Sequence, residues 1–351
     1  PEDDGDVRGV KETERRGTGA GMRGSRMDKK IDIHLHLSER AIPEGLGMKI
    51  SSGTEMLPHL DALGIGMGIV MSSGEKQAVF GSNASCRKIA EQYPDRYAWM
   101  CMLDETEPET VYERLKKYRS EGAVGVGELT VNRRMDHPFL EAVFQAAEAL
   151  GLPVLFHMSP EEGFQYGVVD EPGLPLLERT LQKYPDLILI GHSQPFWHEI
   201  SGDAGASRED RYEWGKGPVT PGGRLGQLFE AYPNLYGDLS ANSGGCAVMR
   251  DETFGLAFLE TWKDRLMFGT DMVNVDMEFP LGSWLDQKAA EGALSLAAYQ
   301  AVVSGNAERI FRLCGNRDRE SEGRSAAAEA EEPSGKIIEE KTMKGDQGWR
   351  K

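Results

Sequence analysis

Short apolar runs that end in a histidine or an acidic residue recur through this chain of 351 residues. Six side chains at or just beyond the ends of such runs can bind a metal ion: His34, His36, Glu128, His157, His192 and Asp271. When strands run parallel in a closed barrel, residues at their carboxyl ends converge at one mouth even if they lie far apart in sequence. The recurrence therefore predicts one site assembled from several strand ends.

The first pair, His34 and His36, closes the run Ile31–Ile33. Their spacing of two places both imidazoles on the same face of a strand, so they can chelate one ion. Imidazole and carboxylate ligands hold a zinc-type ion while leaving a position open for water. Only seven histidines exist here, and four of them follow strand-like runs, which disfavours a purely structural role for the set. We assign no metal role to the other three, His59, His137 and His198.

Strand-like and helix-like segments alternate along the chain, a pattern typical of βα units. The eight expected strands are 31–35, 66–71, 98–103, 123–127, 153–156, 187–190, 235–239 and 266–269, and amphipathic segments include 106–120, 138–150 and 172–184. Eight such units predict a (β/α)8 TIM barrel with an enlarged loop, 195–224, after the sixth strand. The alternative, a doubly wound open sheet, lacks its Gly-rich phosphate loop after the first strand.

The two ends of the chain are polar and nearly free of apolar residues. We expect residues 1–30 to be a disordered extension, 31–317 to be the catalytic domain, and 318–351 to be a disordered tail. Neither end is expected to carry chemistry.

Composition limits the classes of partner. The formal net charge of −17 argues against nucleic acid or an anionic membrane surface and favours a small-molecule substrate. The four cysteines lack disulfide or metal-finger spacing, and the longest apolar runs are only strand-sized. We therefore predict a cytoplasmic protein, and the sequence permits a homo-oligomer.

With these residues in place, the chain resembles the amidohydrolase superfamily, and specifically the amidohydrolase-related branch that includes aminocarboxymuconate-semialdehyde decarboxylase. The likeness covers residues 31–313. Its motifs are Asp32-Ile33-His34-Leu35-His36, Phe156-His157, Gly191-His192-Ser193, Phe268-Gly269-Thr270-Asp271 and the closing segment Gly305-Asn306-Ala307-Glu308-Arg309-Ile310-Phe311.

The resemblance implies roles for these side chains. The metal ligands would be His34, His36, His157 and Asp271, with His192 as a further ligand or as the acid/base. Asp271 would also accept a proton from water. Glu128 departs from the decarboxylase pattern and resembles the carboxylate that bridges two ions in binuclear hydrolases of the superfamily. We therefore expect one or two divalent ions, Zn²⁺ or Mn²⁺, with Glu128 among the ligands and Asp271 and His192 as catalytic residues.

The predicted function is hydrolysis of a small amide, lactone or ester by metal-activated water. One alternative is a metal-dependent, non-oxidative decarboxylase of a small aromatic or unsaturated acid. A second is a barrel without catalysis that serves as a binding protein. Asp238 is predicted as either a substrate contact or a structural turn residue, and Trp197, His198, Tyr212 and Trp214 as either a lid or aromatic packing.

Overall fold

The computed structural model of the chain describes residues 29–45, 47–76 and 80–313. The first strand begins at Lys30, one residue before its predicted start. Most of the predicted extension 1–30, the last four positions of the predicted domain and the whole of the predicted tail 318–351 lie outside the described residues. The expected domain boundaries therefore stay predictions.

Eight strands lie parallel to their neighbours and follow one another in chain order. Their bounds are Lys30–Leu35 (β1), Ile65–Met71 (β4), Tyr97–Met100 (β5), Val126–Leu129 (β6), Val154–Ser159 (β7), Leu189–His192 (β9), Leu235–Asp238 (β10) and Leu266–Met267 (β11). Hydrogen-bonded pairing joins β1, β4 and β5 in one group and β6, β7, β9, β10 and β11 in another. Each predicted strand is present, with ends shifted by a few residues.

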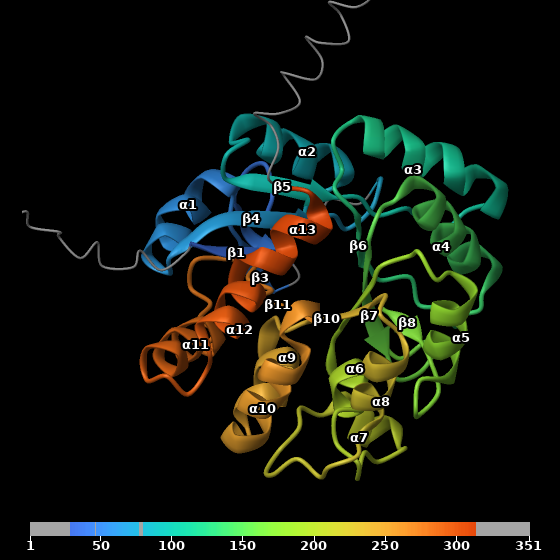
Figure 1. The fold of residues 1–351 in the computed structure, drawn as a ribbon. Helices are drawn as coiled ribbons and strands as arrows, with labels where there is room; N and C mark the ends of the chain where they lie inside the picture. The colour runs from blue at the N-terminus through green and yellow to red at the C-terminus, as the bar shows by residue number, and fades with distance from the viewer. Residues whose placement is uncertain (1–28, 46, 77–79, 314–351) are drawn as a thin grey trace, which may run out of the picture.

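Backbone hydrogen bonds join these two groups into a ring. Beside β5 and β6, the amide of Gly127 donates to the carbonyl of Cys101 over 2.8 Å. Between β1 and the residue after β11, the amide of Ile33 donates to the carbonyl of Phe268 over 3.1 Å. The predicted (β/α)8 TIM barrel is confirmed by this ring and by the helices around it (Figure 1).

Apolar side chains fill the inside of the barrel. Ile33, Met71, Leu155 and Ile190 are fully buried there in one cluster with Phe311. Phe311 belongs to α13 (Asn306–Phe311), and residues near the starts of several strands pack against the same cluster. The last helix therefore closes the end of the barrel where the strands begin, which leaves the opposite end for a site.

Helices surround the strands on the outside (Figure 1). Their bounds are Gly53–Ala62 (α1), Asn83–Gln92 (α2), Val111–Ser120 (α3), Pro138–Leu150 (α4), Pro175–Lys183 (α5), Arg224–Ala231 (α8), Ala241–Met249 (α9), Glu252–Trp262 (α10), Leu281–Ala290 (α11) and Leu296–Gln300 (α12), with single turns at Pro108–Thr110 (η1), Lys263–Arg265 (η2) and Ala301–Gly305 (η3). The predicted segment 138–150 coincides with α4. Proline fits its first turn, and Gly151 ends it with a positive φ of 62° that glycine adopts without strain.

The enlarged loop after β9 contains two short helices, Gln194–His198 (α6) and Arg208–Tyr212 (α7). Trp197 is buried, and its Nε1 donates to the backbone carbonyl of Asp238 over 2.9 Å, so this ring belongs to the aromatic packing and not to a lid. Trp214 remains about half exposed. The loop was thus predicted in the right place, while its aromatic residues have different surroundings.

Three short strands were not predicted. Ile42–Gly45 (β2) and Met48–Ile50 (β3) form an antiparallel pair, and Val168–Val169 (β8) pairs with β7. Their sequences, Ile-Pro-Glu-Gly, Met-Lys-Ile and Val-Val, contain no apolar run of the length that marks the eight barrel strands. In the part of the chain that the structure describes, no helix combines the length and apolar character needed to cross a membrane.

The closure of the barrel generates a stability prediction. The hydroxyl of Thr270 donates to Asp32 over 2.6 Å, and both residues are buried. Thr270→Val should lower the free energy of unfolding by about 1–3 kcal/mol, because it leaves a buried carboxylate oxygen without this donor. Thr261→Val, which removes an exposed helical hydroxyl, is the control and should change stability by less than about 0.5 kcal/mol. Equal denaturant midpoints for the two variants would contradict the closure argument.

Candidate metal centre

The barrel brings the six predicted side chains together. His34 and His36 lie in and just after β1, Glu128 in β6, His157 in β7, His192 at the end of β9, and Asp271 beyond β11. All are buried except Asp271, whose side chain is 27% exposed. The three remaining described histidines lie elsewhere: His59 in α1, His137 at the start of α4 and His198 at the end of α6.

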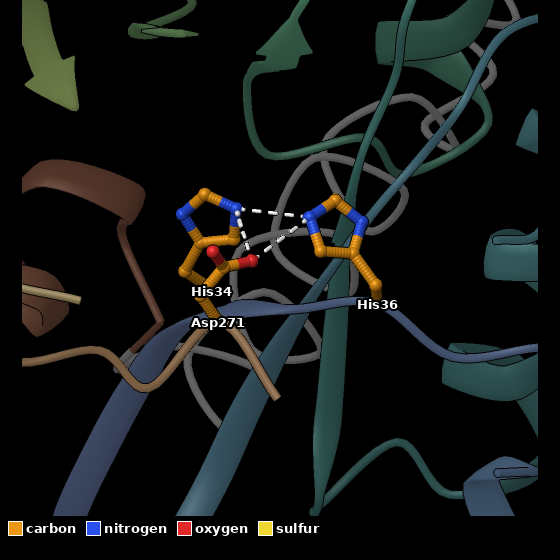
Figure 2. A group of neighbouring side chains, drawn as sticks. All are labelled: His34, His36 and Asp271. Atoms are coloured by element: carbon orange, nitrogen blue, oxygen red, sulfur yellow. Dashed lines mark hydrogen bonds and ion pairs between the residues drawn. The ribbon is translucent and has the colours of Figure 1, made fainter. Parts of the chain in front are cut away.

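His34, His36 and Asp271 form the first group of donors (Figure 2). The Nε2 atoms of the two imidazoles are 3.1 Å apart. Oδ1 of Asp271 lies 3.4 Å from Nε2 of His34 and 3.3 Å from Nε2 of His36. Three donor atoms from two neighbouring strands thus point at one small volume.

Glu128 lies between this group and a second one. Its Oε2 is 3.3 Å from Nε2 of His36 and 3.7 Å from Nε2 of His34. Its Oε1 is 2.7 Å from Nδ1 of His157 and 3.8 Å from Nε2 of His192. Glu128, His157 and His192 therefore make a second donor group, and the two oxygens of one carboxylate face different groups.

Asp238 is a residue whose role the sequence did not settle. It ends β10, is fully buried, and its Oδ2 is 2.7 Å from Nδ1 of His34 and 3.1 Å from Nδ1 of His192. These contacts place it behind two imidazoles of the cluster. Its Oδ1 also accepts the amide of Ser240, two residues on, over 2.9 Å, so the contacts fit the structural turn and not the substrate contact. An acidic residue at a strand end was the available signal, but its partners depend on the register of three strands.

Asp32 and Thr270 hold Asp271 in place. Oδ1 of Asp32 accepts the backbone amides of His34 and Thr270, each over 3.0 Å. Asp271 has a φ of 62°, in the left-handed region that few residues other than glycine adopt, and its amide donates to the carbonyl of His34 over 2.8 Å. Strained backbone of this kind persists where the surrounding structure fixes it, often at functional sites. Here it turns the Asp271 carboxylate toward the two histidines.

Gly269 lies where a larger side chain would collide with Asp238 and His34. A Cβ added to Gly269 would lie 2.9 Å from Oδ1 of Asp238 and 3.3 Å from Cβ of His34. The Gly-Thr-Asp sequence thus combines close approach, a hydroxyl donor and a carboxylate at three successive positions.

The histidines of the first group have raised pKa values. Burial lowers the pKa of His34, but the carboxylates of Asp271 and Asp238 outweigh burial and hold it well above its ordinary value. Burial also lowers the pKa of His36, and hydrogen bonds to Asp271 and Glu128 again raise it overall. Both imidazoles therefore keep a proton to higher pH than an ordinary histidine does, and an incoming cation must displace it.

The acids and the second group behave differently. Burial raises the pKa of Glu128, yet His157 and His34 bring it well below its ordinary value. For Asp271, burial is likewise outweighed by His34 and His36, and the pKa is lowered. His157 has a lowered pKa because burial exceeds the attraction of Glu128. Glu128 and Asp271 therefore stay ionised to lower pH than ordinary carboxyl groups, and His157 loses its proton at lower pH than an ordinary histidine.

Two aromatic rings, which the sequence did not indicate, border the cluster. The ring of Phe80 lies 5.2 Å from that of His36, and the ring of Tyr166 lies 4.4 Å from that of His157, measured between centroids. Tyr166 is 57% exposed. Both follow strands in loops, where no periodic pattern marks an inward-facing ring. They cover the outer sides of two histidines and leave Asp271 accessible.

The donor set fits a divalent metal ion. With ligands about 2.0–2.1 Å from a tetrahedral ion, neighbouring donor atoms are about 3.3 Å apart. The distances from Nε2 of His34 and of His36 to each other, to Oδ1 of Asp271 and to Oε2 of Glu128 range from 3.1 to 3.7 Å. Nitrogen and carboxylate donors of this kind suit zinc, manganese and similar ions. The coarser prediction of a divalent-metal site is supported, whereas the ligand assignment of each residue remains a prediction.

A barrel with a cluster of imidazoles and carboxylates at its mouth defines a class of metal-dependent enzyme, and the comparisons place the chain within it. Residues 31–313 match the amidohydrolase family, and the chain belongs to that family. The predicted family and enzyme class are thereby confirmed. No curated protein matches the sequence.

Solved structures share the fold at low sequence identity. An uncharacterised TIM-barrel protein from Bordetella bronchiseptica is 17% identical, with a TM-score of 0.56 over 81% of this chain and 99% of that one. A 2,6-dihydroxybenzoate decarboxylase from Rhizobium is 18% identical, with a TM-score of 0.53 over 82% and 100%. A probable 2-pyrone-4,6-dicarboxylic acid hydrolase from Acinetobacter baumannii is 14% identical, with a TM-score of 0.52 over 81% and 99%. These likenesses establish the fold.

The raised pKa values of His34 and His36 generate a prediction for metal binding. Because the folded pKa values are raised, the protonated forms persist to higher pH, and binding must release protons. Zinc affinity should therefore increase as the pH rises from 6 to 8. Calorimetric titration at pH 7 in buffers of different ionisation enthalpy should show release of about one or more protons per ion. Affinity independent of pH, with no proton release, would contradict these pKa directions.

Proposed function

We propose that this protein is a metal-dependent hydrolase that cleaves an amide, lactone or ester of a small molecule. The observation that carries the proposal is the position of Glu128, whose two oxygens face two separate groups of metal donors. Two-metal hydrolytic sites use a bridging ligand to hold ions about 3.5–4 Å apart. His34, His36 and Asp271 would hold one ion, and His157 and His192 the other, with Glu128 shared.

Zinc is our choice of metal, with manganese as the alternative, because the predicted ligands are four imidazoles and only two carboxylates. A bound ion of this type polarises a carbonyl and lowers the pKa of water from 15.7 to about 7. Family members act on small molecules, and the partly open mouth beside Asp271 suits such a substrate. A cytoplasmic location remains part of the proposal.

Asp271 would serve as the proton acceptor. Its Oδ1 faces His34 and His36, while its Oδ2 is 3.8 Å from Nε2 of His192 and belongs to the most exposed side chain of the cluster. Oδ1 would thus be a metal ligand, while Oδ2 would take a proton from the attacking water and return it to the leaving group. The lowered pKa keeps Asp271 in its ionised form, the form in which a carboxylate can take up a proton.

A non-oxidative decarboxylase is the second candidate, and one observation favours it. Oε2 of Glu128 lies close enough to His34 and His36 to join Asp271 around a single ion. His192 would then be free to move a proton at the substrate carbon that loses carboxylate. Acid formation without carbon dioxide supports the hydrolase, whereas carbon dioxide release supports the decarboxylase.

Replacing Asp271 tests the proposed reaction. Asp271→Asn keeps a side chain that tolerates positive φ but cannot take a proton. On a panel of amides, lactones and esters, zinc-loaded Asp271→Asn should lose about 10²- to 10⁴-fold in turnover relative to the native protein. Asp276→Asn, an exposed acid a few residues away, is the matched control and should retain native rates. Native turnover by Asp271→Asn would remove this residue from the reaction.

Metal content tests the role of Glu128. Elemental analysis after loading with excess zinc should give close to two ions per chain in the native protein, as for a two-metal site. Glu128→Ala should hold about one, because the shared ligand is lost. Glu278→Ala, which changes an exposed acid, should keep the native content. One tightly held ion in both the native protein and Glu128→Ala would favour the decarboxylase.

A further inference from the structure

Asp238 contacts two imidazoles that belong to different donor groups. Its Oδ2 is 2.7 Å from Nδ1 of His34, in the first group, and 3.1 Å from Nδ1 of His192, in the second. The hydroxyl of Ser240 donates to the same oxygen over 2.7 Å, and the Ser240 amide donates to Oδ1 over 2.9 Å. Asp238, His34 and Ser240 are fully buried, and His192 is 1% exposed.

Hydrogen-bond chemistry fixes where the imidazole protons lie. An ionised carboxylate only accepts hydrogen bonds, and a buried charge without donors is costly. If the neutral rings of His34 and His192 carried their proton on Nε2, two nitrogen lone pairs would face Asp238 at hydrogen-bonding distance. Both Nδ1 atoms must therefore carry protons, which leaves Nε2 of each ring as the only atom free for other chemistry.

We propose that Asp238 is a positioning residue that fixes both His34 and His192 with Nδ1 protonated and Nε2 directed at the metal donors. The proposal rests on the proposed function for the identity of what Nε2 binds. Nε2 of His34 faces His36 and Asp271, and Nε2 of His192 faces Glu128 and Asp271. His192 accordingly binds a metal or moves a proton at Nε2 alone.

Asp238 is itself held from several sides. Its backbone carbonyl accepts a hydrogen bond from Nε1 of the buried Trp197. Its backbone ends β10, which lies between β9 and β11 in the sheet. The small size of Gly269 leaves room for Oδ1. The carboxylate therefore has little freedom to move toward one histidine and lose its contact with the other. The orientations of the two donor groups are linked through this side chain.

Ser240 has a supporting part. Its hydroxyl is within 3.3 Å of Nδ1 of His34 and 3.1 Å of Nδ1 of His192, an arrangement that superficially resembles a nucleophile beside its base. The hydroxyl is fully buried and gives its proton to Asp238, so it cannot reach a substrate at the mouth. It completes the set of donors around the carboxylate.

The test is nuclear magnetic resonance of protein with ¹⁵N-labelled histidine, in the zinc-free and zinc-loaded states. His34→Asn and His192→Asn assign the signals. In the native protein, Nδ1 of both residues should carry a proton in both states, and zinc should occupy only Nε2. In Asp238→Asn the side-chain NH₂ group faces either the two Nδ1 atoms or the Ser240 amide. If it faces the Nδ1 atoms, two donors oppose each other, and each histidine can relieve this by moving its proton to Nε2. Loss of the Nδ1 proton from His34 and His192, with zinc affinity about 10- to 100-fold weaker, is the expected result.

Asp170→Asn is the matched control, since Asp170 is an equally buried carboxylate that accepts the backbone amides of Glu171, Leu176 and Leu177 but contacts no imidazole nitrogen. Its tautomers should be native. An unprotonated Nδ1 at either residue in the native protein would overturn the proposal without any variant having to fold, as would native tautomers in Asp238→Asn. Failure to bind zinc would overturn the proposed function, while the zinc-free spectra still decide the role of Asp238.

Discussion

The structure of the site depends on one carboxylate placed among four imidazoles. Glu128 contacts His157 over 2.7 Å with one oxygen and approaches His36 within 3.3 Å with the other. In a buried environment such a charge requires compensating positive charge or hydrogen-bond donors. Protons on the histidines can supply it, and so can metal ions, which compete for the same nitrogen atoms. This competition makes the cluster suitable for reversible metal binding and links its occupancy to pH.

A second level of side chains fixes the geometry of those donors. Asp32 joins β1 to the segment after β11 through Thr270, and the left-handed backbone at Asp271 directs its carboxylate inward. Asp238 does the same for the imidazoles from behind. Supporting contacts of this type orient ligands, and removing one typically weakens metal affinity about 10- to 100-fold. The barrel contributes the arrangement, because strands far apart in sequence end at the same mouth.

Most of the barrel and the residues of the metal-donor cluster could be predicted from the sequence, whereas several contacts around the cluster could not. Hydrophobic runs locate the eight strands and the polar residues that follow them. They therefore predict that His34, His36, Glu128, His157, His192 and Asp271 lie close together, as they do in the structure. The partners of Asp238 could not be found in this way, since they depend on how β1, β9 and β10 align. Phe80 and Tyr166 lie in loops whose course is set by tertiary contacts, and the strands β2, β3 and β8 lack the apolar runs that mark the barrel strands.

The central claim is that Glu128 is shared between two donor groups, one on each of its oxygens. The most direct measurement is an anomalous difference map from crystals of the zinc-loaded protein, recorded on both sides of the zinc absorption edge. The account predicts two peaks about 3.5–4 Å apart with an oxygen of Glu128 bound to each. A single peak among His34, His36 and Asp271, with Glu128 bonded only to His157, would contradict it.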